Sequence, residues 1–268
     1  MAATAPNSAN CKGYYTFDTN YDDSTDNNDL TAVGVPTITS TAIYGKGLNI
    51  SGSGIYLKAT SSNFNLSTAD FTVYYWFNIS SGLPSSNIGF EFGGSTNYHS
   101  VSLSLSPSTR NIGIHKSTNG TSWNSLISSA GIWSYNTWNM VTYTRSGDDW
   151  TIYLNNVSVA THNSGDVITT DTRISMCTNY TLASAGTGNW DELSIFNTAH
   201  STDEMDYMYN SGSPGSAQQY PFSAAANFQL NIGDSWKTAS ALKINIGDSW
   251  KVVASAKVNI GDSWKTIF

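Results

Sequence analysis

The sequence has 268 residues, of which 12% are charged, and its formal net charge is −7. This acidic balance, without any cluster of Lys and Arg, excludes a nucleic-acid-binding surface, and no apolar run approaches the roughly 18 residues of a membrane span. The length allows one large domain plus a small appendage, and 13% aromatic residues indicate a packed core.

Residues 1–10 contain neither a basic segment nor an apolar one, so a standard secretory signal is not expected and this segment is predicted to be a flexible arm. Cys11 and Cys177 show no CxxC spacing and therefore form no zinc site. Two unpaired thiols are the favoured interpretation, and one disulfide is the alternative.

Short runs with a period of two fill the chain from Gly13 to about Ile195, and turn residues separate them. In one run, Phe71, Val73, Tyr75, Phe77 and Ile79 are all apolar or aromatic, as in a strand with one face in the core. The spacing of the runs, mostly near ten residues, predicts an all-β sandwich. The predicted strands are 13–18, 47–50, 54–58, 71–79, 88–92, 100–106, 111–115, 138–146, 150–155, 157–162, 173–177 and 189–196.

Two local signals complete this region. Asn155-Asn156 predicts a tight hairpin turn, because Asn tolerates the left-handed conformation. Ser201-Thr-Asp-Glu204 is a capping box that predicts one short helix, with Met205 and Met208 packed on the sandwich and Gly212 as its stop. Residues 213–226 are interpreted as a linker.

The last forty residues or so (227–268) contain a strict repeat. Asn231-Ile-Gly-Asp-Ser-Trp-Lys237 recurs as Asn245–Lys251 and Asn259–Lys265. Gly and Asp supply a tight turn between two short strands, so each unit is predicted to be a β-hairpin. A single hairpin is marginal in stability, which predicts stacking or assembly through Trp236, Trp250 and Trp264, either on other proteins or on copies of the chain.

With the strands placed, residues 11–212 resemble a laminin-G-like jelly roll of the concanavalin A-like class. The resemblance implies a two-sheet antiparallel sandwich and rests on several short motifs in the expected order. These are Tyr14–Asp18 with the acidic loop Asp22–Asp29, Tyr44–Leu48, Phe71–Trp76, Trp138–Tyr143 with Trp150–Asn155, and Asn189–Phe196 with Ser201–Glu204.

The tail resembles short "(Ile/Val)-Gly-x-x-Trp-Lys" repeats at the ends of phage virion proteins. This resemblance implies a structural protein of the virion surface, in capsid decoration or in a fibre or tail, and fits the missing signal because virions leave by lysis. The alternatives are a carbohydrate-binding module of a cellular surface or extracellular protein, and a glycoside hydrolase or lyase.

The resemblance also implies a structural calcium ion between the acidic loop and the last strand. Carboxylate and amide oxygens suit this hard cation, and Asp18, Asp23, Asn28 and Asp191 are the expected ligands. The other interpretation is a solvated turn in which Asp18 and Asp191 cap backbone N–H groups.

Catalysis is not expected. A glycosidase needs two carboxylates facing one sugar, yet adjacent Asp191 and Glu192 should point to opposite faces of a strand, and Glu91 is isolated. The four histidines are interpreted as surface or turn residues. Glycan binding by this fold uses aromatic platforms in loops, for which the candidates are Tyr98, Trp123, Trp133 and Tyr135.

Overall fold

The computed structural model describes residues 4–25, 28–65, 69–81, 88–93, 101–118, 122–166, 172–178, 187–210, 220 and 222, together with the strands between 228 and 266. It consists of two compact units, Met1–Phe222 and Ser223–Phe268. Within the described residues, no helix has the length and apolar character needed to cross a membrane.

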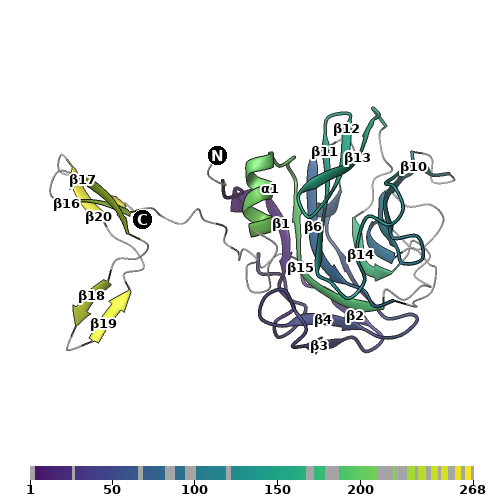
Figure 1. Cartoon of the computed structure of the whole chain (residues 1–268), viewed down its shortest axis with the longest axis horizontal. Coiled ribbons are helices and arrows are strands. Elements are labelled where there is room, and N and C mark those ends of the chain that lie inside the picture. Colours follow the sequence, from purple (N-terminus) through teal and green to yellow (C-terminus); the bar gives the residue numbers. More distant parts are fainter. Residues whose placement is uncertain are drawn as a thin grey trace. The chain divides into compact units, whose positions relative to one another are not determined.

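The first unit is a sandwich of two antiparallel sheets (Figure 1). The eight-stranded sheet has the order β13-β12-β11-β6-β15-β4-β3, with β1 also paired to β15, and the seven-stranded sheet has the order β10-β9-β8-β7-β14-β5-β2. The strands are β1 Cys11–Tyr15, β2 Thr31–Val33, β3 Thr37–Thr39, β4 Gly47–Ile50, β5 Tyr56–Thr60, β6 Phe71–Asn78, β7 Ile88–Phe92, β8 Val101–Ser106, β9 Asn111–Lys116, β10 Asn124–Ile127, β11 Asn139–Ser146, β12 Asp149–Leu154, β13 Val157–Asn163, β14 Arg173–Thr178 and β15 Gly188–Phe196.

The main core lies between the two sheets. Strand β6 contributes Phe71, Val73, Tyr75 and Phe77, and the facing sheet contributes alternate residues such as Phe90 and Leu103. The predicted all-β jelly-roll sandwich is therefore confirmed. Cys177 lies in this core and Cys11 in a second cluster on the outer side of the eight-stranded sheet, and both are buried free thiols.

Three strands of the sandwich were not predicted from the sequence. Strands β2, β3 and β10 have three or four residues each and expose much of their surface. All three lie at sheet edges. A strand this short carries too few alternating apolar residues to be recognised by its period.

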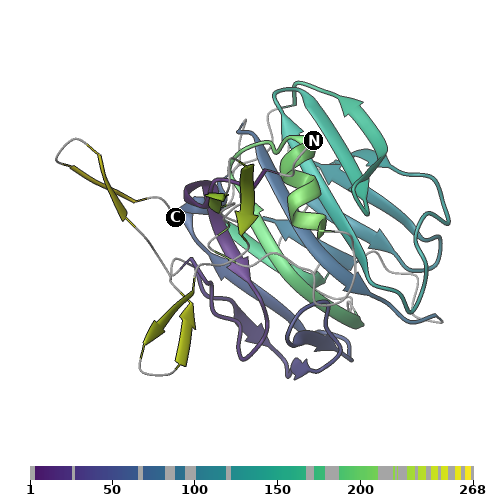
Figure 2. The same ribbon diagram turned by 60° about the vertical axis from the view of Figure 1, so that its left-hand side comes forward.

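One α-helix, α1 (Thr202–Tyr209), covers the outer side of the eight-stranded sheet near β1 and β15 (Figures 1 and 2). Ser201 and Glu204 form the predicted capping box, and Met205 and Met208 are buried as predicted. The predicted stop at Gly212 is wrong, because Asn210 adopts the left-handed conformation and caps the helix earlier. Two short 3-10 helices, η1 (Ser8–Asn10) and η2 (Ser62–Phe64), complete the unit.

The two ends of this unit are tied together. The Ser8 hydroxyl accepts a hydrogen bond from the Phe222 N–H at 2.9 Å, and Phe222 packs edge-on to Tyr14 at 5.3 Å between ring centroids. The Thr4 N–H donates to the Asp203 carbonyl. The predictions of a flexible arm at 1–10 and of a linker through 226 are therefore wrong for residues 4–10 and for Phe222, because a buried aromatic anchor and backbone hydrogen bonds hold both segments.

The second unit contains three hairpins, as predicted. They pair β16 (Phe228–Ile232) with β17 (Ser235–Ala239), β18 (Lys243–Ile246) with β19 (Ser249–Val252), and β20 (Lys257–Ile260) with β21 (Ser263–Thr266). The register is the same in each, since Asn231, Asn245 and Asn259 lie opposite Trp236, Trp250 and Trp264.

Candidate functional site

A continuous row of polar residues crosses the outer face of the seven-stranded sheet. Each member lies directly opposite the next in the strand register, so all their side chains emerge on the face turned away from the core. The row runs Ser125, His115, Ser102, Glu91, Ser175, Lys58 and Thr31, on strands β10, β9, β8, β7, β14, β5 and β2. It is exposed at Ser125 and Thr31, half-buried at His115 and Lys58, and buried at its centre.

Glu91 occupies the centre of this polar row. Its side chain is 1% exposed, and its Oε1 accepts a hydrogen bond from the Ser102 hydroxyl at 2.6 Å. Burial raises the pKa of Glu91 well above its ordinary range, and the bond from Ser102 opposes this shift. Within the described residues, Glu91 Oε2 and the Oγ of the neighbouring Ser175 have no hydrogen-bond partner. Buried polar atoms of this kind cost free energy until a partner satisfies them.

His115 connects three strands at the half-buried part of the polar row. Its Nδ1 lies 2.7 Å from Ser125 Oγ and its Nε2 lies 3.0 Å from Ser104 Oγ. Gly113 makes room for this ring, because a Cβ there would lie 2.9 Å from His115 Nε2. Burial lowers the pKa of His115, which favours the neutral imidazole. A neutral ring that bridges two hydroxyl groups is suited to hydrogen bonding with uncharged ligands.

The structure separates the four predicted glycan-binding aromatic residues. Trp123 is half-buried and its ring lies 6.1 Å from that of His115, at the exposed end of the polar row. Trp133 is 1% exposed in the main core, so its prediction as an exposed platform is wrong. Tyr135 packs against Trp133, with the Arg110 guanidinium 5.5 Å from its ring centroid. Tyr98 lies outside the described residues.

Sequence reasoning missed the polar row itself. The signal was present in Ile88-Gly-Phe-Glu-Phe92 and in Val101-Ser-Leu-Ser-Leu-Ser106, where small or polar residues alternate with core residues. The alternation places Glu91 and Ser102 on one face, but only the strand order brings β7, β8, β9 and β14 together. The interpretation of His115 as a surface or turn residue has the same cause, because its position in the row depends on the strand order.

The four expected calcium ligands do not form one metal site. Asp23 accepts hydrogen bonds at both oxygens, among them the Tyr14 N–H at 2.8 Å and the Asn28 N–H at 3.1 Å. Asp18 accepts the Lys46 N–H at 2.6 Å. The described part of the chain contains no group of three or more His, Cys, Asp or Glu side chains that could hold a metal ion. These four residues therefore do not fit a calcium ion. Asp18, Asp23 and Asp191 instead accept backbone N–H groups, as the alternative interpretation expects.

Asp191 and Glu192 lie on the same face of β15, which contradicts the expectation of opposite faces. A β-bulge between Asp191 and Ser194, with Glu192 at φ 52°, interrupts the alternation. Asp191 accepts the N–H groups of Ile43 and Tyr44, and Glu192 accepts the Tyr14 hydroxyl. Burial and the charge of Glu192 raise the pKa of Asp191. Both carboxyl groups are buried and hydrogen-bonded within the fold, so their role is to fix these segments on β15.

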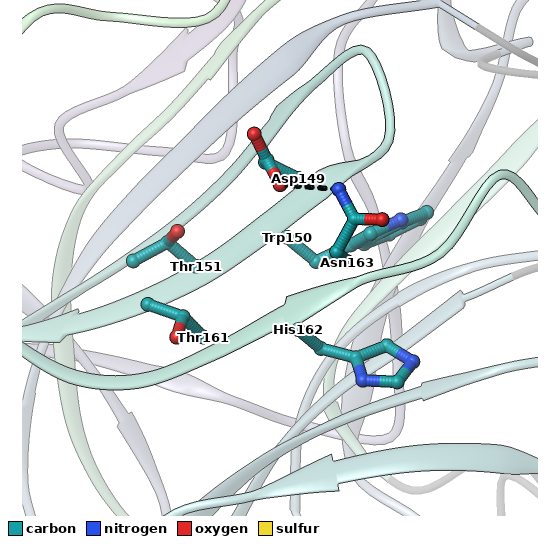
Figure 3. A pocket seen from close by; sticks show the side chains of 6 residues that line it. All are labelled: Asp149, Trp150, Thr151, Thr161, His162 and Asn163. Carbon is teal, nitrogen blue, oxygen red and sulfur yellow. Dashed lines mark hydrogen bonds between the residues drawn. The ribbon is translucent and has the colours of Figure 1, made fainter.

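A shallow pocket lies on the hairpin of β12 and β13 (Figure 3). Thr151 faces Thr161 across the pair, and Asn163 donates a hydrogen bond to Asp149 at 2.7 Å. Trp150 lines the pocket but is 0% exposed, because its indole belongs to the main core. The pocket therefore offers hydroxyl, amide, carboxyl and imidazole groups, and its one indole is buried.

Solved structures with this fold include binding domains of botulinum neurotoxins. The serotype D binding domain aligns with a TM-score of 0.63 and 14% identity, over 97% of this chain and 74% of that one. The serotype D ligand binding domain in complex with N-acetylneuraminic acid aligns with 0.62 and 16%, over 80% and 56%, and the receptor binding domain of the C/D mosaic serotype with 0.61 and 15%, also over 80% and 56%. The chain thus spans little more than half the length of the latter two, and these likenesses show the fold alone.

A search of curated proteins found no match. Residues 51–206, more than half of the chain, match a laminin G family model of the concanavalin A-like lectin/glucanases superfamily. The two sheets and their connections agree with this match. The chain belongs to the concanavalin A-like lectin/glucanase superfamily.

Proposed function

We propose that the jelly roll is a non-catalytic domain that binds glycans with the outer face of its seven-stranded sheet. The observation that carries this proposal is the polar row, which leads from the half-buried ring of Trp123 to buried Glu91. Aromatic rings beside hydroxyl, imidazole and carboxyl groups supply the stacking and hydrogen bonding that sugars use. The sialic acid complex of one fold neighbour supports glycans as the ligand class to test.

Binding is favoured over hydrolysis by the content of the row. Glu91 is its single carboxyl group, whereas both mechanisms of glycoside hydrolysis need two. The other members are hydroxyl groups, one imidazole and the ammonium group of Lys58. None of these is the second carboxyl group that those mechanisms need. Incubation of the chain with a polysaccharide panel should release no reducing ends.

The glycan proposal is tested with the full chain on a glycan array. Trp123→Ala should remove most of the binding, because it removes the aromatic ring at the exposed end of the polar row. Thr161→Ala, in the pocket of Figure 3, is the matched surface control and should bind as the unaltered chain does. Loss of binding in Thr161→Ala alone would move the site to that pocket, and an array without any bound glycan would refute the proposal.

We further propose that the protein acts on the surface of a phage virion and that its repeat tail mediates assembly. The support is the resemblance of the repeats to those of virion proteins and the identical register of the three hairpins. Short hairpins bury too little surface to be stable singly. Light scattering should show an oligomer of the full chain that Trp236→Ser, Trp250→Ser and Trp264→Ser together dissociate. A monomeric full chain that also fails to co-purify with virion proteins would refute this assignment.

A further inference from the structure

Two neighbouring polar atoms at the centre of the polar row are complementary in their hydrogen-bonding capacity. Glu91 and Ser175 lie directly opposite each other on β7 and β14. Both side chains are 1% exposed, and neither Glu91 Oε2 nor Ser175 Oγ has a partner within the described residues. Glu91 Oε2 accepts a hydrogen bond as a carboxylate and donates one as a neutral carboxyl group, and the serine hydroxyl can do either.

A single hydroxyl group satisfies both atoms, because its hydrogen is donated and its oxygen accepts. We infer that Glu91 and Ser175 hold one hydroxyl group of the ligand, and that the site selects neutral oligosaccharides over sialylated ones. This inference rests on the proposed glycan binding and names the class of glycan.

Charge excludes an acidic sugar from this position. A sugar carboxylate held here would be a buried charge without a cation paired to it, which is costly even beside a neutral Glu91. Two cations share this face of the sheet. Lys58 is two strands away from Glu91, at about 10 Å by the usual strand spacing. Arg173, two residues from Ser175 on β14, already donates its Nε–H to the Gly93 carbonyl at 2.9 Å. The net charge of −7 also disfavours an anionic ligand.

The size of the ligand follows from the strand order. Ser125, beside the accessible end of the row, and Glu91 are separated by three strand spacings, or about 14 Å. A ligand that contacts both Trp123 and Glu91 must therefore be an oligosaccharide. Affinity should rise with chain length until the ligand reaches Glu91.

Ser175→Ala gives a direct test, because Ser175 Oγ makes no hydrogen bond to the described protein and its removal should not lower Tm. Ser194→Ala is the matched control, since Ser194 Oγ is also buried and without a partner, but lies on β15 of the other sheet. For a neutral oligosaccharide identified on the array, Ser175→Ala should weaken binding about 5- to 10-fold, the worth of one neutral hydrogen bond. Ser194→Ala should bind normally.

The outcomes separate this inference from the proposed function. If neutral glycans bind and Ser175→Ala behaves like Ser194→Ala, the hydroxyl site is refuted while glycan binding stands. Tighter binding of a sialylated glycan than of its neutral counterpart would overturn the selectivity alone. If no glycan binds at all, the proposed function is refuted, and the inference that rests on it is refuted with it.

Discussion

His200 should make the jelly roll less stable in mild acid. The residue is 7% exposed, its Nδ1 lies 2.7 Å from the Tyr74 hydroxyl, and its ring centroid lies 4.2 Å from that of Phe196. Burial lowers the pKa of His200 to about 4, although the charge of Glu204 opposes the shift. The imidazole of an unfolded chain has a pKa of about 6.5. As pH falls from about 6.5 to about 4, the unfolded state therefore binds a proton that the folded state does not, and stability is lost over that window.

The magnitude follows from these two pKa values. At pH 5 the unfolded state is favoured by about 2 kcal/mol relative to pH 7.5, and the full effect below pH 4 is about 3 kcal/mol. His200→Gln removes the titrating group and keeps an acceptor for the Tyr74 hydroxyl. The difference in unfolding free energy between pH 7.5 and pH 5 should shrink by about 2 kcal/mol in this variant, while buried carboxyl groups contribute equally to both proteins and cancel.

Urea denaturation at the two pH values measures this difference. His162→Gln replaces a half-buried histidine at the pocket of Figure 3 and is the control for loss of a histidine side chain. Equal pH dependence in the unaltered chain and His200→Gln would refute the reasoning. Should His200→Gln fail to fold, NMR titration of the unaltered chain decides, because a His200 ring protonated at pH 6 would contradict its buried, neutral state.

Three other predictions concern the core, the polar row and the acidic loop. Trp133→Ala should cost about 3–5 kcal/mol in denaturant unfolding, and half-buried Trp123→Ala about 1 kcal/mol or less; equal costs would show that Trp133 is misplaced in the core. Burial raises the pKa of Glu91, so stability is lost as pH rises above the ordinary carboxyl range, and Glu91→Gln should raise Tm at pH 8 but not at pH 4. A Tm gain of the same size at both pH values would contradict the raised pKa of Glu91. EDTA should leave Tm unchanged, because Asp18, Asp23 and Asp191 already accept backbone N–H groups; a fall in Tm that calcium reverses would support the metal site implied by the family resemblance.

The regular parts of the fold could be predicted from the sequence because their signals are local. The period of two in β6, the left-handed Asn155 and Asn156 of the β12–β13 turn, and the capping box of α1 all depend on neighbours in the chain. Residues 4–10 and Phe222 were misjudged because their anchoring contact joins Ser8 to Phe222, far apart in sequence.

The site was harder to predict, since it depends on strand order. Nothing local brings Glu91 beside Ser175, because the two are separated by eighty residues or so and meet only when β7 pairs with β14. The bulge at Glu192 likewise reverses a side chain that strict alternation would place on the other face. Trp123 was identified from its loop position, whereas Trp133, chosen by the same criterion, proved to be core.

The most direct test of the account is a crystal structure of the full chain with the neutral oligosaccharide that binds best on the array. We expect the sugar on the outer face of the seven-stranded sheet, with one ring beside Trp123 and one hydroxyl group within hydrogen-bond distance of Glu91 Oε2 and Ser175 Oγ. A sugar bound at the pocket on β12 and β13, or on the side of the sandwich that α1 covers, would contradict the assignment of the polar row as the glycan site.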